Sequence, residues 1–138
     1  MLSRTVTVVL DTPREEVFAY LAQVRNLPDW ATEFARELHE DENGVYVVNG
    51  LGRFRFRIEA DPDTGVIDMY AGPDADRMAL FPTRVVPLAD GRSAYSFTMF
   101  KDPDMPYELF ESQYESLRRE LAIVRARFAA DRPSCRTG

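Results

Sequence analysis

An apolar stripe near the C-terminus is the longest regular pattern in the chain. Its members are separated by three and four residues in turn, which places them on one face of an α-helix. They are Tyr107, Phe110, Tyr114, Leu117, Leu121, Val124 and Phe128. The pattern predicts a helix over residues 103–130, on the order of 40 Å long. A coiled-coil seam is the alternative interpretation, although a stripe of this length is near the lower limit for one.

From about Arg36 to Phe100 the apolar residues recur with a period of two, which is typical of strands. In residues 53–60, three arginines and a glutamate alternate with Phe54, Phe56, Ile58 and Ala60. This alternation predicts an antiparallel strand that is buried on one face only. Turn sequences at 41–44, 61–65, 72–75 and 90–91 separate further strands at about 36–41, 45–48, 66–71, 77–86 and 93–100.

Four further features complete the predicted secondary structure. A β-branched segment, Thr5–Leu10, predicts a first strand and brings the total to about seven. Thr12, Pro13 and Glu15 have the spacing of a capping box with proline at the first helical position, so we expect a helix from Pro13 to about Val24. A second, short helix is predicted over 29–35, and Pro82 predicts a bulge or an edge position in its strand.

The composition is that of one globular domain. The chain has 138 residues, of which 45% are apolar and 29% charged, and at this length folding hides about two-thirds of the surface of the unfolded chain. We expect a single domain over 1–132 and a flexible tail over 133–138. The net charge of −6 argues against general binding to nucleic acid. Six arginines gather in residues 117–138; they are interpreted as cations near a helix C-terminus, with an anion- or partner-binding patch as the alternative.

Several classes of chemistry are excluded by what the sequence lacks. One histidine, His39, and one cysteine, Cys135, cannot form a disulfide framework or a site that needs two imidazoles. No nucleotide-binding, calcium-binding or nucleophile-elbow motif is present. We therefore expect no metal and no cofactor. No apolar run approaches the roughly 20 residues of a membrane span, and with no secretory start the expected location is cytoplasmic.

The predicted elements lead to a cavity. Seven strands would make a flat sheet about 30 Å wide, whereas one helix is about 10–12 Å across. The sheet must therefore curl around the long helix, and the short helices must close the remaining opening. This predicts an α+β fold in which a curved antiparallel sheet of about seven strands wraps around a long C-terminal helix, with two short helices after the first strand. A sheet curled around one helix seldom fills its interior, so we expect a pocket larger than roughly 300 Å³ between the two.

The order of these elements resembles a known superfamily. A first strand, Val6–Leu10, leads into the capped helix start Asp11-Thr-Pro-Arg-Glu-Glu-Val-Phe-Ala-Tyr-Leu21, and a loop then leads to Pro28-Asp-Trp30. With the meander and long helix that follow, this resembles the helix-grip fold of the START and polyketide cyclase/dehydrase (SRPBCC) superfamily, to about Ala130. The resemblance implies the fold more specifically than the function, because the superfamily includes lipid and hormone carriers, aromatic polyketide cyclases and chaperone co-activators. It assigns no catalytic motif to individual residues.

Candidate ligand-binding residues are the large apolar side chains expected to face the interior. They are Trp30, Phe34, Phe54, Phe56, Met69, Met78, Tyr95, Phe97, Met99, Phe110, Tyr114 and Leu117. Burial in an ordinary core accounts for all of them equally well, since each buried apolar side chain contributes about 1.5–3 kcal/mol. The flexible methionines favour a surface that accommodates apolar ligands of variable shape.

Four residues are candidates for acid–base or anchoring chemistry, each with a simpler alternative. His39 can transfer protons near neutrality, but it has acidic neighbours close to a turn, as a solvated histidine would. Arg84 could anchor a carboxylate or enolate and Asp68 could pair with it or act as a base, yet both fit the outer face of a strand. Tyr95 could orient a polar group. The row formed by Arg53, Arg55 and Arg57 is either a solvated outer face or an anion-binding ridge.

Three functions compete at this point. The first is binding of a small hydrophobic molecule, with aromatic or polyketide-like compounds among the candidates, in a cavity beneath the long helix. The second is a polyketide cyclase/aromatase-type enzyme that uses acid–base residues in that cavity. The third is a protein-interaction module with a filled core. As partners we expect a small hydrophobic molecule, no nucleic acid and no membrane, with the protein a monomer or a homodimer.

Overall fold

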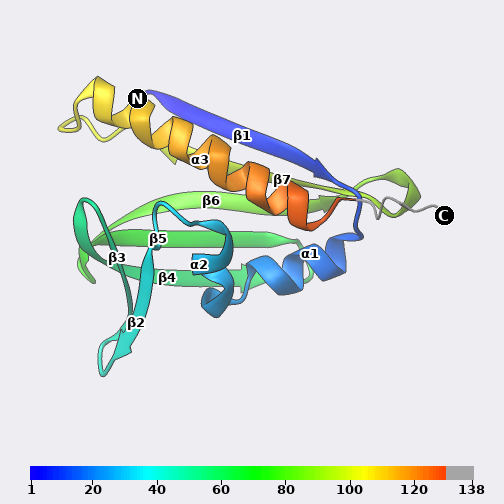
Figure 1. Ribbon diagram of the computed structural model, residues 1–138, viewed down its shortest axis with the longest axis horizontal. Coiled ribbons are helices and arrows are strands. Elements are labelled where there is room, and N and C mark those ends of the chain that lie inside the picture. Colours follow the sequence, from blue (N-terminus) through cyan, green and yellow to red (C-terminus); the bar gives the residue numbers. More distant parts are fainter. Residues whose placement is uncertain (130–138) are drawn as a thin grey trace.

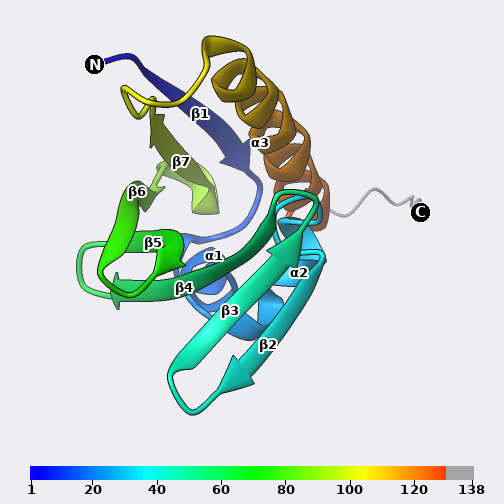
Figure 2. The same ribbon diagram turned by 90° about the vertical axis from the view of Figure 1, so that its left-hand side faces the viewer.

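The computed structural model describes residues 1–129, so the predicted tail 133–138 and Cys135 lie outside the described residues. Seven strands form one antiparallel sheet in the order β1-β7-β6-β5-β4-β3-β2. Their bounds are β1 Ser3–Leu10, β2 Glu37–Asp41, β3 Gly44–Asn49, β4 Gly52–Asp61, β5 Val66–Asp74, β6 Arg77–Pro87 and β7 Ser93–Phe100. The predicted curved sheet is confirmed, because the strands bend around the interior as Figure 2 shows.

Three α-helices cover the concave face of this sheet (Figure 1), and two 3₁₀ turns lie in the connections. They are α1 Arg14–Leu21, the 3₁₀ turn η1 Val24–Asn26, α2 Leu27–Trp30, a second 3₁₀ turn η2 Ala89–Gly91, and α3 Tyr107–Arg127. The long helix α3 runs beside β1, and α1 and α2 lie below its C-terminal half in Figure 1. This is the predicted α+β architecture, with a sheet wrapped around one long helix and short helices after the first strand. Within residues 1–129, no helix is long and apolar enough to cross a membrane.

The apolar stripe of α3 faces the sheet, which excludes the coiled-coil alternative. Phe110, Leu117, Leu121 and Val124 are buried in the core. Tyr107 is the exception and is 50% exposed, because the helix begins there, after Pro106, and not at residue 103. The start of α3 is therefore exposed, and its buried face begins at Phe110. A polar residue, Glu120, is buried in the same stripe, only 5% exposed.

The first helices differ from the prediction in their bounds. The expected helix over Pro13–Val24 ends at Leu21, and the second helix spans Leu27–Trp30 instead of 29–35. Pro28 lies in the first turn of that second helix, where a missing N–H costs nothing, so it starts a helix and does not end one. The predicted capping box is wrong. The Thr12 hydroxyl donates to the Phe128 carbonyl oxygen at 3.1 Å, which fastens the β1–α1 junction to the end of α3.

Two strand predictions also change. The turn expected at 72–75 is wrong, because β5 continues to Asp74 with an irregularity in register after Ala71, and the turn follows at 75–76. Pro82 lies in a strand with neighbours on both sides, but the β6–β7 register covers only Thr83 to Pro87. Pro82 thus marks the residue where β6 separates from β7, as expected for a residue that has no N–H to donate.

Candidate functional site

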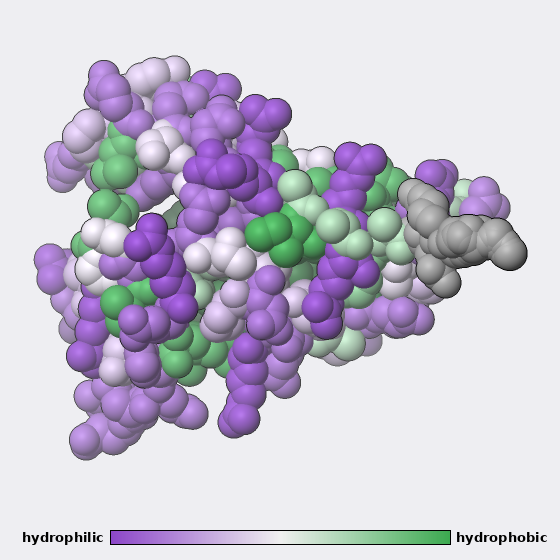
Figure 3. Space-filling view, viewed as in Figure 1, coloured by the Kyte–Doolittle hydropathy of each residue, from purple (hydrophilic) through white to green (hydrophobic). Residues whose placement is uncertain are grey.

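A cavity of about 430 Å³ lies between α3, the segment from Leu27 to Arg36 and the concave face of the sheet. In Figure 3 the surface is hollowed beneath the first half of α3. The walls are mainly apolar. The apolar side chains are Leu27, Trp30, Ala31, Phe34, Leu51, Phe56, Met69, Ala71, Phe81, Phe97, Met99, Leu109 and Leu117. The volume exceeds the roughly 300 Å³ expected from the sequence and falls within the range of small-molecule sites.

Strand alternation places these side chains and also leaves the space between them. Met69 and Ala71 on β5 share the inner face, where the small side chain of Ala71 leaves volume empty. Aromatic pairs bound the space on two sides. The rings of Phe34 and Phe56 lie 5.8 Å apart, and those of Phe81 and Phe97 lie 6.0 Å apart. The second pair lies where the backbone pairing between β6 and β7 ends. The rings of Phe81 and Phe97 therefore fill the gap between the two strands on this side of the cavity.

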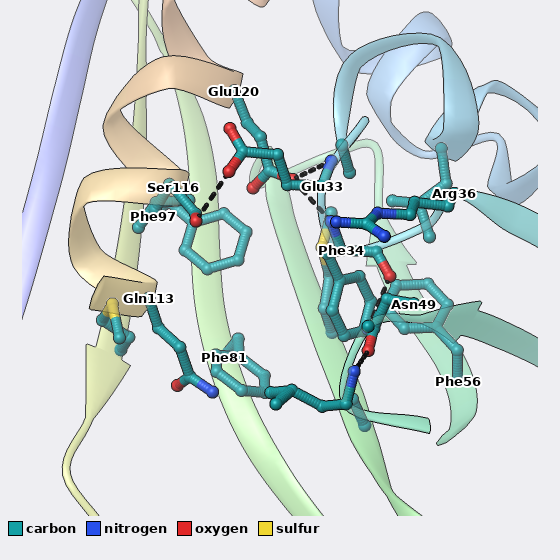
Figure 4. A pocket seen from close by; sticks show the side chains of 18 of the residues that line it. Glu33, Phe34, Arg36, Asn49, Phe56, Phe81, Phe97, Gln113, Ser116 and Glu120 are labelled. Carbon is teal, nitrogen blue, oxygen red and sulfur yellow. Dashed lines mark hydrogen bonds between the residues drawn. The ribbon is translucent and has the colours of Figure 1, made fainter. Parts of the chain in front are cut away.

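One end of the cavity is polar, and Glu120 is its most deeply buried polar member. The Oε2 atom of Glu120 accepts the backbone N–H groups of Glu33 at 3.0 Å and Phe34 at 2.9 Å. These bonds link α3 to the segment after α2 (Figure 4). Burial raises the pKa of Glu120 to about 7, and the two amide donors oppose that shift only in part. The side chain can therefore carry a proton near neutral pH.

Glu33 lies beside Glu120 and has the opposite environment. Arg119 donates two hydrogen bonds to its carboxylate, at 2.7 and 2.8 Å, and the Ser116 hydroxyl donates a third at 2.9 Å. These donors, Arg119 first, lower the pKa of Glu33 to about 2. The cavity thus has one ionised carboxylate and, next to it, one carboxyl that keeps its proton to higher pH.

The remaining polar residues form the rim of the cavity. Asn49 donates to the Phe34 carbonyl oxygen at 2.8 Å and accepts the Leu51 N–H at 2.8 Å, which ties the β3–β4 turn to the segment after α2. Arg36 lies on the same side, and Gln113 extends from α3 toward Phe81 (Figure 4). The rim can therefore contact polar parts of a ligand while the apolar walls enclose the rest.

Seven of the twelve candidate ligand-binding residues line this cavity. They are Trp30, Phe34, Phe56, Met69, Phe97, Met99 and Leu117. The other five do not: Phe54, Tyr95, Phe110 and Tyr114 lie in or against the core, and Met78 lies outside it. Tyr95 and Phe110 are fully buried behind the cavity wall, with the Tyr95 ring against Trp30. Tyr114 lies under the Arg4 guanidinium at 5.0 Å. That any of the twelve residues contacts a ligand stays a prediction.

Phe54 and Met78 are displaced from the cavity for different reasons. Phe54 pairs with Val47 in the middle of the β3–β4 ladder and packs against the core, although residues on both sides of it along the hairpin, Leu51 and Phe56, line the cavity. Met78 follows the unexpected turn at 75–76 and lines a second hollow of about 450 Å³ between the segment Ala22–Val24 and the β3–β4 hairpin. Periodicity places Phe54 on the same face as Phe56, whereas in β6 the residue that lines the cavity is Phe81 and not Met78.

The four candidate catalytic residues do not meet in the cavity. His39 lies on the edge strand β2, where it is 45% exposed and its Nε2 contacts Glu37 at 2.8 Å. Arg84 is exposed and donates to the Thr64 carbonyl oxygen at 3.0 Å. Asp68 stands opposite Glu59 and Pro82, on the face away from Met69. Burial raises the pKa of Tyr95, so this hydroxyl stays protonated at ordinary pH.

The arginine row of β4 and the arginines of α3 lie mostly on the surface, while Arg132 and Arg136 of the C-terminal group lie outside the described residues. On the outer face of the sheet, Arg55 forms hydrogen bonds with Asp41, and Arg53 stacks over the Tyr46 ring at 3.6 Å. On α3, Arg119 pairs with Glu33, and Arg127 lies 4.1 Å from the centre of the Tyr20 ring. Several of these cations are therefore already engaged by side chains of the same chain. Residues 1–129 contain no group of three or more side chains that could hold a metal ion.

Glu120, which does line the cavity, was missed from the sequence. A signal was present, because Glu120 follows Leu117 by three residues and precedes Val124 by four, both members of the buried stripe. A carboxyl at such a position faces the interior of the fold. The acid–base candidates predicted from the sequence all lie on predicted strands or close to a turn, whereas Glu120 is a charged residue within an otherwise apolar helix face.

Comparison with known proteins identifies the fold but no family. No protein-family model matches the chain, and no curated protein matches it. Solved structures do. The Zhui aromatase/cyclase from Streptomyces sp. R1128 superposes with a TM-score of 0.71 over 99% of this chain and 98% of its own, at 20% identity.

Two other similar structures extend the comparison. The protein XoxI from Bacillus cereus gives a TM-score of 0.73 at 15% identity, over 93% of this chain and 96% of its own. A START superfamily protein from Mycobacterium smegmatis gives 0.61 at 14% identity, over 91% and 96%. The chain therefore has the helix-grip fold of START and polyketide cyclase-like proteins, as the order of its elements indicated.

Proposed function

We propose that this protein binds a small, predominantly apolar molecule in the cavity beneath α3, with aromatic compounds as the class that fits best. The observation that carries the proposal is the cavity itself. A volume of about 430 Å³ is lined by apolar side chains from α2, α3 and four strands, opens to the surface, and has polar groups gathered at one end. This combination of apolar walls and a few convergent polar groups is typical of ligand sites.

The nature of the walls favours aromatic ligands. Phe34, Phe56, Phe81 and Phe97 present ring faces and edges to the cavity, and aromatic pairs prefer the tilted and edge-to-face arrangements that such walls offer. Met69 and Met99 add flexible thioethers that adapt to the outline of a ligand. One of the similar structures is an aromatase/cyclase, which supports the proposal at the level of the fold only.

The alternatives are unequally supported. The cavity argues against an interaction module with a filled core, because packed interiors contain few voids larger than a water molecule. A cyclase/aromatase-type activity has one specific observation in its favour, the buried carboxyl of Glu120 in the cavity wall. A single protonatable group can polarise a carbonyl. The four candidates predicted from the sequence do not line the cavity; they are His39, Asp68, Arg84 and Tyr95.

Binding can be tested with 1-N-phenylnaphthylamine, a neutral aromatic dye whose fluorescence rises in apolar surroundings. We expect saturable binding by the wild-type protein and a rise in melting temperature with dye concentration. Native mass spectrometry of freshly purified protein should also detect a co-purified hydrophobic compound. The variant Ala71→Phe places a ring in the empty volume and should weaken dye binding at least tenfold.

The matched control for the cavity variant is Ala122→Phe, which adds the same ring to the exposed face of α3 and should bind the dye like the wild type. Near-ultraviolet circular dichroism checks that both variants are folded. Equal dye binding by Ala71→Phe and the wild type would contradict the proposal. So would a broad set of apolar compounds that leaves the melting temperature of the wild type unchanged.

A further inference from the structure

The two oxygens of the Glu120 carboxyl have different surroundings. Oε2 is held by the N–H groups of Glu33 and Phe34 at 3.0 and 2.9 Å. Both bonds require this oxygen to be an acceptor. Glu120 also lines the cavity, so the second oxygen, Oε1, is the atom available to a molecule bound there. The side chain is only 5% exposed, and its orientation is fixed by backbone donors instead of solvent.

The charges around Glu120 favour its neutral form. Three titratable residues line the cavity: Glu33, Arg36 and Glu120 itself. Glu33 is ionised and adjacent, which disfavours a second negative charge. The cation nearest to the pair, Arg119 on α3, directs its hydrogen bonds to Glu33, and Arg36 lies at the rim on the same side as Asn49 (Figure 4). In residues 1–129, Glu120 forms no ion pair with an arginine or lysine.

We propose that Glu120 carries a proton on Oε1 and donates it in a hydrogen bond to a neutral oxygen of the bound molecule, so that the cavity selects apolar compounds with a carbonyl group. This inference rests on the proposed binding function and names the ligand class for the same site. With Oε2 fixed as the acceptor of two N–H bonds, the protonated carboxyl is a donor directed at the cavity. It serves as the polar anchor of an otherwise apolar site.

The same geometry discriminates against two related classes of ligand. A hydrocarbon of equal shape leaves the buried Glu120 donor without a partner, which costs binding free energy. A carboxylate loses its hydration and comes close to the ionised Glu33 without gaining a free cation. A ketone or aldehyde avoids both penalties. The site is therefore expected to rank carbonyl compounds first, hydrocarbons second and carboxylates last.

Three naphthalene probes of similar size test this order: 2-acetonaphthone, 2-ethylnaphthalene and 2-naphthoate. Competition with 1-N-phenylnaphthylamine gives the affinity of each for the whole protein. At pH 6 the ketone should bind about five- to tenfold more tightly than the hydrocarbon, as one buried hydrogen bond implies. Since the donor is lost on ionisation, ketone affinity should fall about tenfold between pH 6 and pH 8, whereas hydrocarbon affinity should change much less.

Two variants of Glu120 separate hydrogen bonding from mere packing. Glu120→Gln keeps a carbonyl oxygen for the two backbone donors and an N–H for the ligand, so its preference for the ketone should persist and become independent of pH. Glu120→Leu removes the donor and should reduce the ketone-to-hydrocarbon ratio to about one. Glu115→Gln, on the exposed face of the same helix, is the control and should behave like the wild type.

The outcomes distinguish this inference from the proposed function. If none of the three probes binds the wild type, the binding function itself fails. If the ketone and the hydrocarbon bind equally well and with the same pH dependence, the cavity is a binding site but the role of Glu120 is refuted. A red shift of the carbonyl stretch of bound 2-acetonaphthone at pH 6, absent in Glu120→Leu, is the spectroscopic sign of the bond. Should Glu120→Leu fail to fold, Glu120→Gln and the wild-type pH series decide the question.

Discussion

Two glutamates that lie side by side have opposite protonation behaviour in this protein. Burial raises the pKa of Glu120 to about 7, whereas hydrogen bonds from Arg119 lower that of Glu33 to about 2. The consequences for stability have opposite signs. Between about pH 4.5 and 7 the unfolded chain releases the Glu120 proton while the folded protein retains it, so stability falls as pH rises through this window. Glu33 contributes stability that is complete above about pH 4.5 and lost as pH falls toward 2.

The variant Glu120→Gln should therefore be more stable than the wild type at pH 8, by up to about 3 kcal/mol, since each pH unit between 4.5 and about 7 corresponds to about 1.4 kcal/mol. At pH 4 the difference should nearly vanish, because the glutamate is then protonated in the folded state and largely so in the unfolded chain. Urea denaturation at pH 4, 6 and 8 measures it. Glu115→Gln is the exposed control, and a Glu120→Gln effect that is the same at all three pH values would contradict the assignment.

At the scale of single elements, the buried faces of the strands and of the long helix were predicted correctly from the sequence, whereas a helix cap and the position of a turn were not. The alternation in β4 and the stripe of α3 placed Phe56 and Leu121 in the core, because a whole face must be buried together. The Thr12 capping box failed, because its hydroxyl bonds to Phe128, more than a hundred residues away in the chain. The turn after Ala71 moved for a similar reason, since Gly72 allows the Arg77 carbonyl to approach and the strand to continue.

Gly65, in the turn between β4 and β5, has both a left-handed backbone conformation and a close contact with Val85 of β6. Its φ of +81° favours glycine, and its carbonyl oxygen accepts the Val85 N–H at 2.9 Å. A Cβ at this position would lie 2.1 Å from the Val85 carbonyl oxygen. We expect Gly65→Ala to lower the free energy of unfolding by about 3 kcal/mol, from backbone strain together with overpacking.

Gly91→Ala is the matched control for this prediction. Its φ of +72° is similar, but no atom lies within 4 Å of the added Cβ. The strain alone should cost about 1 kcal/mol there. Urea denaturation of both variants separates the two effects. Equal losses would mean that the close approach of Val85 contributes nothing.

At the scale of the molecule, stability should decrease from the centre of the sheet to β2. β5 and β6 have neighbours on both sides, whereas β2 pairs only with β3 and has charged, exposed side chains. We expect the amides of β2 to exchange with solvent fastest among the strands, apart from terminal residues, and those of β5 and of the paired part of β6 slowest. Hydrogen exchange followed by mass spectrometry measures this gradient.

Ligand binding should change that gradient locally. With saturating 2-acetonaphthone, protection should increase in residues 31–36 and 112–120, which line the cavity, and stay unchanged in β2. Uniform protection along the chain would place the probe elsewhere. The sequence predicted the cavity from the mismatch in width between sheet and helix. It could not predict where along the strands the cavity ends, because the turns and bulges that decide this depend on contacts between distant residues.

The short register between β6 and β7 has a consequence for the size of ligand that the proposed site would accept. From Thr83 toward the start of β6 the two strands are no longer paired, and the rings of Phe81 and Phe97 lie 6.0 Å apart across this place. Moving the unpaired parts of the strands apart would disturb this side-chain contact but none of the paired positions from Thr83 to Pro87. If the cavity binds a ligand as proposed, we expect a bulkier ligand to displace Phe81 and Phe97, at the position where Pro82 ends the pairing of the two strands.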